Sequence, residues 1–131
     1  MRKPLPTPTP ETQPFWDGCA AGELRYQRCR SCGSVQPLPR SWCERCHAED
    51  LEWLRASGRG TILSFTVVHR APTAAWREET PYVIAIVEGE EGFRLMVNVI
   101  GGEQPGLAIG AAVTIGFQTR DGVVLPEARL A

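Results

Sequence analysis

Hydrophobic and polar residues alternate at a period of two along most of the second half of the chain. In residues 60–70 (GTILSFTVVHR), Leu63, Phe65 and Val67 fall on one face, and comparable runs occupy 81–89, 92–102, 112–119 and 123–130. A period of two is that of a β-strand, whose successive side chains point to opposite faces. The pattern therefore predicts five strands.

Turn residues between these runs indicate how the strands connect. The polar stretch EGEEG (88–92) predicts one β-hairpin, and Asp121-Gly122 predicts a second. No helical pattern separates the strands, and glycines stand at the expected bends, which favours a small Greek-key barrel of OB type. Pro126 inside the last run indicates an edge or an opening there. The two long connections, 71–80 and 101–110, are where function is expected.

The first half of the chain has a different character. Residues 1–14 contain five prolines, so we expect no helix there but an extended arm, either disordered or lying on a partner. The sequence FWDGCAAGEL (15–24) predicts a short helix that Phe15 and Trp16 anchor and that ends near Gly22. Short strands are expected on either side of the cysteine region, at LRYQRC and LEWLRAS.

Composition and charge exclude some function classes. The 131 residues carry a formal net charge of −1, and the pI is about 6.1. No strong global field therefore draws the protein to nucleic acid or to an anionic membrane. No apolar run reaches the ~18 residues that span a bilayer, and the amino terminus lacks the apolar region of a signal peptide. We expect a cytoplasmic protein without a membrane partner.

Four of the five cysteines form two pairs with metal-ligand spacing, Cys29-x₂-Cys32 and Cys43-x₂-Cys46, ten residues apart. Cytoplasmic thiols stay reduced, so metal ligation is favoured over disulfides. Each pair presents two thiolates, and four thiolates complete the tetrahedron that Zn²⁺ prefers. We therefore predict zinc, with iron, which fits the same four thiolates, as the alternative metal. Cys19 is interpreted as a small apolar residue that packs the short helix.

Two other interpretations of the cysteine pairs are weaker. A thioredoxin-like CxxC would be single and would open a helix in a βαβ unit. The run CERCH (43–47) matches the haem-attachment pattern, but the first pair explains the second better. His47 is then a surface residue rather than a ligand.

The sequence contains no recognisable catalytic motif. His47 and His69 lie in different segments, with no serine motif or carboxylate pair in a recognisable arrangement near either. GxGxxG and P-loop motifs are absent, and GEEG is more simply a hairpin turn. An independent enzyme is therefore not expected.

Several motifs together carry a resemblance to a known family. The runs PFWDG, GELRYQRCRSCG, WCERC, LEWLRASGRGTILSFTVVHRAP, PYVIAIVE, GFRLMVNVIGG and IGAAVTIGF occur in the order of a widespread family of acyl-CoA-associated proteins, formerly a domain of unknown function. The similarity covers about residues 15–130. One departure is His47, where the family often has a glycine after the second cysteine pair.

The resemblance implies a mainly β fold: a short N-terminal helix, a rubredoxin-like zinc ribbon and a five-stranded OB-fold barrel. We accordingly divide the chain into a proline-rich arm (1–14), the helix with the zinc ribbon (15–57) and the OB-fold (58–131). The resemblance also implies an accessory role beside thiolase-like enzymes of lipid or sterol metabolism: acetoacetyl-CoA thiolases, hydroxymethylglutaryl-CoA synthases, sterol-side-chain retro-aldolases and polyketide-type acyltransferases. In such heteromeric complexes the catalytic residues sit in the partner.

Acyl-CoA binding needs cations for phosphates and a flat surface for adenine. The first long barrel connection offers His69, Arg70 and Trp76. Arg28 and Arg30 of the ribbon are further candidates for phosphate or partner contacts, as are the neighbouring Arg40 and Arg45. Each has a plainer interpretation, because ribbon arginines are usually solvated and Trp76 can simply pin its loop.

The alternative function is nucleic-acid binding, because zinc ribbons and OB folds both occur in proteins that bind nucleic acid. Charge argues against it, since residues 60–131 carry five Lys and Arg against eight Asp and Glu, a net −3. A purely structural adaptor without ligand contact is a third interpretation that the sequence does not separate from the first. The favoured prediction is a non-catalytic subunit that binds a thiolase-like partner and helps present acyl-CoA.

Overall fold

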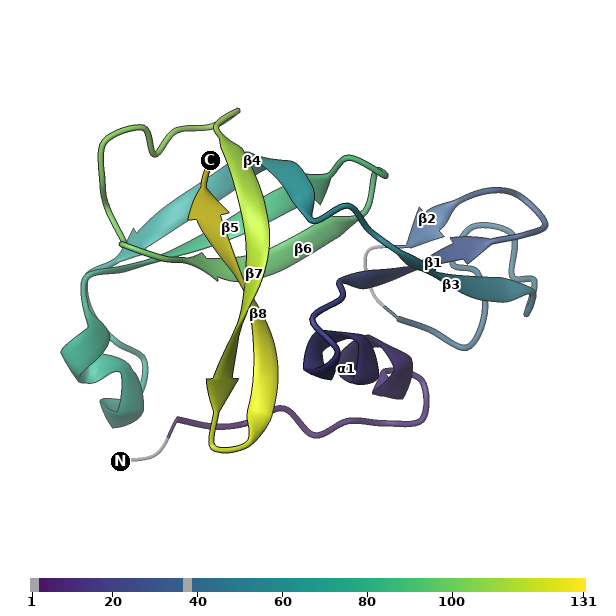
Figure 1. Ribbon diagram of the computed structural model, residues 1–131, viewed down its shortest axis with the longest axis horizontal. Coiled ribbons are helices and arrows are strands. Elements are labelled where there is room, and N and C mark those ends of the chain that lie inside the picture. The colour runs from purple at the N-terminus through teal and green to yellow at the C-terminus, as the bar shows by residue number, and fades with distance from the viewer. Residues whose placement is uncertain (1–2, 37–38) are drawn as a thin grey trace.

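The computed structural model describes residues 3–36 and 39–131 and confirms the predicted class, a mainly β protein with one short α-helix. The predictions that fall on residues 1–2 of the arm and 37–38 of the segment between the cysteine pairs lie outside the described residues. Two sheets are present. A three-stranded sheet and a closed barrel lie side by side, with helix α1 beneath their junction (Figure 1).

The three-stranded sheet, here called the ribbon together with its loops, has the order β2-β1-β3 with antiparallel pairing. Its strands are β1 (Arg25–Cys29), β2 (Val35–Gln36) and β3 (Leu51–Arg55). Between residues 25 and 55, the fully buried residues that the structure describes are two cysteines and two glutamines: Cys29, Cys43, Gln27 and Gln36. The ribbon therefore lacks an apolar core of its own.

The barrel contains the five strands that the sequence predicts, closed in the order β4-β5-β6-β8-β7. The strands are β4 (Arg59–Val68), β5 (Tyr82–Gly89), β6 (Arg94–Val99), β7 (Ala112–Arg120) and β8 (Val123–Leu130). This cyclic order, with β4 pairing β7, is that of an OB-fold. Strands β6 and β8 meet in parallel at the pair Val99 and Ala128, whereas β7 and β8 pair along their whole length.

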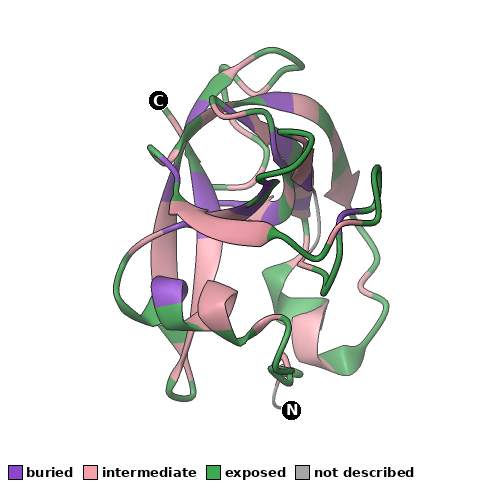
Figure 2. Cartoon of the chain, turned by 90° about the vertical axis from the view of Figure 1, so that its right-hand side faces the viewer, coloured by how far each residue is buried: buried purple, intermediate pink, exposed green. Residues whose placement is uncertain are grey.

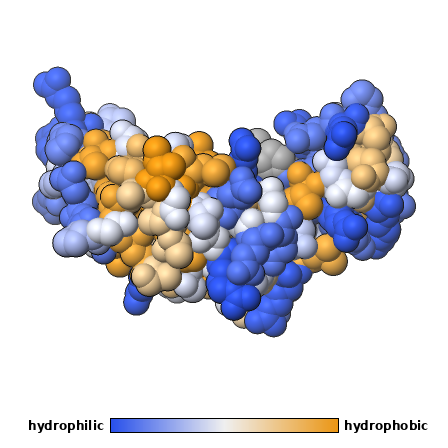
Figure 3. Space-filling view, turned by 90° about the horizontal axis from the view of Figure 1, so that it is seen from above, coloured by the Kyte–Doolittle hydropathy of each residue, from blue (hydrophilic) through white to orange (hydrophobic). Residues whose placement is uncertain are grey.

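The barrel core consists of small and branched apolar side chains, including Ile62, Val83, Val87 and Val113, each at most 1% exposed. Figure 2 shows the buried segments on the strands of the barrel, whereas the loops at the ribbon end are mostly exposed. Seen from above, hydrophobic residues gather over the barrel and hydrophilic ones over much of the ribbon (Figure 3). The principal hydrophobic core is therefore in the barrel.

One prediction about the first barrel strand is wrong. The sequence predicts Leu63 on the same face as Phe65 and Val67. Phe65 and Val67 pack against the core, whereas Leu63 is half-buried and lies outside the core cluster, and its neighbour Ile62 is buried instead. The pairing of β4 with β5 shifts between Ile62 and Ser64. Such a bulge inserts an extra residue, which reverses the inward and outward positions on one side of it.

The helix also differs from its predicted limits. Helix α1 spans Gln13–Ala20, so it begins before Phe15 and contains Pro14, which was assigned to a helix-free arm. Proline is tolerated in the first helical turn because the N–H that it lacks would have no partner there. After Ala20, Gly22 adopts a φ of 75°, and the chain leaves the helix.

Phe15 and Trp16 hold the helix to the rest of the molecule. Phe15 packs against the core cluster, and the two rings meet edge to face at 5.0 Å. Together with Trp53 and Phe93 they line an apolar cavity of about 260 Å³ between the helix, the ribbon and the barrel. The aromatic pair therefore joins three parts of the same chain.

The barrel connection at 71–80 contains a short helical segment that the sequence did not predict, the 3-10 helix η1 (Ala74–Glu79). None of the helices in the described ranges is long and apolar enough to cross a membrane.

Candidate functional site

Two tight loops of the ribbon present the four paired cysteines. The N–H of Gly33 donates to the carbonyl of Cys29 at 2.8 Å, and the N–H of His47 donates to that of Cys43 at 2.9 Å. Gly33 and His47 both have positive φ, 76° and 64°. His47 thus occupies the left-handed position that Gly33 fills in the first loop, which accounts structurally for its place after the second pair.

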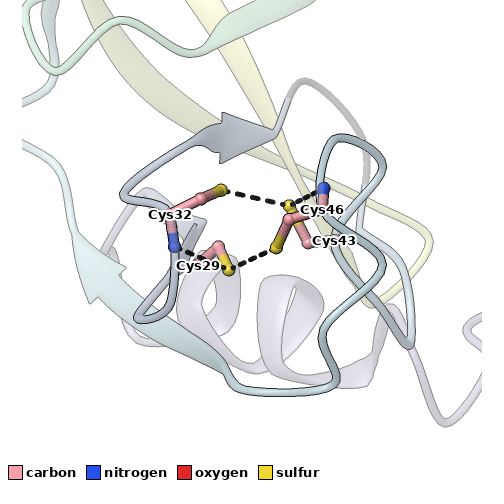
Figure 4. A group of neighbouring side chains, drawn as sticks. All are labelled: Cys29, Cys32, Cys43 and Cys46. Carbon is pink, nitrogen blue, oxygen red and sulfur yellow. Dashed lines mark hydrogen bonds between the residues drawn. The ribbon is translucent and has the colours of Figure 1, made fainter.

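The four sulfur atoms face one another across the space between these loops (Figure 4). All lie within 4.8 Å of one another. The Cys29 and Cys46 sulfurs are 3.5 Å apart, and those of Cys32 and Cys43 are 3.6 Å apart. A tetrahedral zinc site with Zn–S bonds of about 2.3 Å places its sulfurs about 3.8 Å apart. The arrangement therefore has the size and donor set that a tetrathiolate metal site requires.

Backbone N–H groups in the loops favour the thiolate form of two of the cysteines. The N–H of Cys32 is the main cause of the lowered pKa of Cys29. The N–H groups of Cys46 and Arg45 lower the pKa of Cys43 to about 6. Because thiolates are the metal-binding form, these donors support the ligand set.

Cys19 is chemically different from the four paired cysteines. It is 1% exposed within helix α1, outside the four-cysteine cluster. Burial raises the pKa of its thiol to about 11, so it stays neutral at ordinary pH. Its burial confirms the prediction that it is a small residue packing the helix.

Two buried glutamines hold the segment that leads into the second cysteine pair. The Gln27 amide donates to the carbonyl of Arg40 at 2.9 Å and accepts from its N–H at 2.8 Å. The Gln36 amide donates to Gln27 at 2.8 Å and accepts the N–H of Glu44 at 2.6 Å. Glu44 directly follows Cys43, so this glutamine pair fixes the second loop to strands β1 and β2.

Gln36→Leu tests this role of the glutamine pair. The change removes the acceptor for the Glu44 N–H at nearly constant side-chain volume and is expected to cost about 1–3 kcal/mol. We expect metal release to a chromophoric chelator to become about tenfold faster. Gln13→Leu, at an exposed position of α1, is the matched control. Equal release rates for both variants would contradict the role.

The structure does not bring the other candidate residues together. Trp76 lies in η1, and His69 and Arg70 are exposed just after β4. The end of β4 from which this connection leaves lies on the side of the barrel away from the ribbon (Figure 1). Arg28 and Arg30 lie on the ribbon. Arg30 is paired with Asp50 at 3.0 Å and Glu52 at 3.2 Å. The ribbon arginines and the barrel residues therefore do not face one common ligand.

Sequence reasoning missed several residues around Trp76. The Lys3 ammonium lies 4.5 Å and the Arg120 guanidinium 5.0 Å from the centre of its ring, and Tyr82 packs on it at 5.2 Å. Lys3 also pairs with Glu79. The described part of the arm thus contacts the chain's own barrel. The sequence predicts instead an arm that is either disordered or lies on a partner. No local motif marks these residues, and the one signal that could have found Lys3 and Arg120 is their positive charge.

Comparison with known proteins assigns the two parts of the chain. Residues 16–52 match the family described as "ChsH2, rubredoxin-like zinc ribbon domain", and residues 53–118 match "ChsH2, C-terminal OB-fold domain". The 3-oxo-4,17-pregnadiene-20-carboxyl-CoA hydratase alpha subunit of Mycobacterium tuberculosis is 41% identical over 110 residues, which are 82% of this chain and 34% of that protein. The chain thus spans about a third of the length of this relative.

Other similar proteins are closer to this chain in size. A DUF35 domain-containing scaffold protein of Methanothermobacter thermautotrophicus is 35% identical over 77% of this chain and 80% of its own. The benzoylsuccinyl-CoA thiolase subunit BbsA of Geobacter metallireducens is 28% identical over 60% of this chain and 51% of its own.

A solved structure shares the whole architecture. A chain of the "Ltp2-ChsH2(DUF35) aldolase" superposes with a TM-score of 0.84 at 30% identity, covering 96% of this chain and 98% of that one. The two family matches together cover the ribbon and most of the barrel, and the superposition covers nearly the whole chain. The chain therefore belongs to the ChsH2-type DUF35 family, in which a rubredoxin-like zinc ribbon precedes an OB-fold.

Proposed function

We propose that this protein is a non-catalytic accessory subunit that binds a thiolase-like enzyme and helps it to bind or present acyl-CoA. The observation that carries the proposal is the superposition on a chain of the "Ltp2-ChsH2(DUF35) aldolase", which covers 96% of this chain and 98% of that one. Relatives named as a CoA-ester hydratase alpha subunit, a thiolase subunit and a scaffold protein support the same role.

The proposal assigns no reacting group to the two histidines of this chain. His47 and His69 are both exposed, and within residues 3–36 and 39–131 neither makes an ion pair or a side-chain hydrogen bond. A general base is normally oriented by such a partner. The proposal therefore assigns the reacting groups to the partner enzyme.

The ribbon's part in this proposal is structural. Cys29, Cys32, Cys43 and Cys46 would hold one zinc ion, with iron as the alternative metal for the same thiolates. A closed zinc tetrathiolate site leaves no open position for substrate, so zinc would stabilise the fold and supply no chemistry. The division into an arm (1–14), a helix with the ribbon (15–57) and a barrel (58–131) belongs to the same proposal, except that the helix begins at Gln13. A reducing cytoplasmic location belongs to it as well.

A pull-down tests the accessory role directly. The tagged protein is recovered from its native cells at physiological salt with nuclease present, and mass spectrometry identifies what co-elutes. We expect a thiolase-superfamily enzyme in stoichiometric amount. Recovery of nucleic-acid enzymes alone, or of no partner, would contradict the proposal and favour the nucleic-acid alternative or an independent binder.

A further inference from the structure

A polar cavity of about 340 Å³ lies beside Trp76, here called the Trp76 cavity. It is bounded by η1, the adjoining ends of β5 and β6, the glycine turn after β6, the end of β7 and the arm. Its lining side chains include two cations, two aromatic rings and two amides: Lys3, Arg120, Trp76, Tyr82, Asn98 and Gln118. No other cavity described here combines cations with aromatic rings and free amides in this way.

Two positive charges converge on this cavity. The ammonium of Lys3 and the guanidinium of Arg120 both lie within 5.0 Å of the centre of the Trp76 ring, which orients them by cation–π attraction. Lys3 also pairs with Glu79, the acidic residue among the cavity's lining. Arg120 makes no ion pair or hydrogen bond through its side chain in the part of the chain that the structure describes. The cavity thus keeps one uncompensated positive charge and a set of guanidinium donors.

Two amide side chains in the cavity lining are available for hydrogen bonds to a ligand. Asn98 of β6 and Gln118 of β7 line the cavity, and neither side chain has a hydrogen-bond partner among residues 3–36 and 39–131. Each amide offers two N–H donors and a carbonyl acceptor. A ligand that combines an anion with polar ring or sugar groups would satisfy both kinds of side chain.

The position of the cavity within the barrel is that of a ligand face. In OB-folds, ligands bind over the second and third strands, between the loop joining strands one and two and the loop joining strands four and five. Those elements are here β5 and β6, the connection containing η1, and the turn after Arg120. The Trp76 cavity touches β5, β6 and the connection containing η1, and it reaches Arg120, the residue that precedes the turn between β7 and β8.

We propose that the Trp76 cavity binds the phosphate-bearing nucleotide end of CoA, with Lys3 and Arg120 on the phosphates. This inference rests on the proposed function, which supplies acyl-CoA as the ligand class. Because the Trp76 ring already carries two cations, its task is to hold them rather than to stack a base. A nucleic-acid strand is disfavoured because the barrel residues 60–131 carry a net −3 outside this confined site.

Calorimetry on the full, metal-loaded chain tests the inference with adenosine 3′,5′-bisphosphate and with CoA as probes. We expect saturable binding of both that weakens as salt is raised. Arg120→Gln and Lys3→Gln should each weaken binding about tenfold, because each removes a charged donor. Arg77→Gln, an exposed arginine of the same η1 segment outside the cavity lining, is the matched control and should leave the affinity unchanged.

Several results would overturn the inference. These are no saturable binding, equal losses for Arg120→Gln and Arg77→Gln, or inorganic phosphate binding as tightly as the nucleotide. Tighter binding of a single-stranded oligonucleotide, lost in Arg120→Gln, would assign the cavity to nucleic acid. The pull-down separates the two proposals: recovery of a thiolase-like partner by a protein that shows no saturable nucleotide binding would overturn the CoA assignment and leave the accessory role standing.

Discussion

Cys43→Ser is expected to abolish metal binding and to unfold the ribbon while the barrel stays folded. Cys43 is fully buried, and its sulfur lies 3.6 Å from that of Cys32 within the four-sulfur cluster. Because the residues buried in the ribbon are cysteines and glutamines, little apolar burial remains to stabilise it without a metal. Structural zinc contributes about 10–16 kcal/mol in finger peptides, more than a small segment of this kind can replace.

Metal content by mass spectrometry and a two-dimensional amide spectrum check this result. Ribbon signals from residues 25–55 should collapse, and signals from the barrel strands should remain dispersed. Cys19→Ala serves as the control, because this thiol lies in helix α1 and outside the cluster. A Cys43→Ser protein that keeps one equivalent of metal, or an ordered ribbon without it, would refute the tetrathiolate assignment. The same metal analysis on the unaltered protein decides between zinc and iron.

Phe93→Ala is expected to lower the free energy of unfolding by about 3–5 kcal/mol. Phe93 is 6% exposed and stacks on Tyr26 of β1, with ring centres 5.2 Å apart. Its ring also lies directly over Gly89, where an added Cβ would come within 2.4 Å of it. The substitution would therefore leave a void between the barrel and the ribbon, and would remove the stacked partner of Tyr26.

Urea denaturation of the metal-loaded protein measures this loss. Met96→Ala is the comparison, because Met96 lies on the neighbouring strand β6 but is 71% exposed. Its removal should change the unfolding free energy by no more than about 0.5 kcal/mol. If Phe93→Ala lowers the unfolding free energy by less than about 1 kcal/mol, the ring does not stabilise the contact between barrel and ribbon as its packing indicates.

The sequence predicted the barrel well because a period of two and hairpin turns are local signals. It misplaced Leu63 because a bulge depends on how β4 pairs with β5, and that pairing is not visible in one strand. It also missed η1, a 3-10 helix of only six residues, whose apolar and polar residues show no period. The start of α1 was missed because Pro14 was taken as a helix breaker, although the first turn tolerates it.

The candidate sites also differ in whether a local sequence signal predicts them. The cysteine spacing is local, and the structure brings the four sulfurs within 4.8 Å of one another. The Trp76 cavity is built from Lys3, Trp76 and Arg120, which are distant in sequence and meet only through the fold. The glutamine pair was missed for a related reason, since a glutamine in a strand gives no sign that its side chain is buried and hydrogen-bonded.

The barrel has one weak seam, where β6 meets β8 at the pair Val99 and Ala128. Every other strand boundary of the barrel is an antiparallel ladder of several residues. Local opening follows the boundary with the fewest backbone hydrogen bonds, so this seam should separate at a lower free energy than the rest. Val99 and Ile100 also line the Trp76 cavity. Thermal breathing of the barrel would therefore change the width of the cavity first, and the fold would supply an adjustable entrance without a dedicated lid.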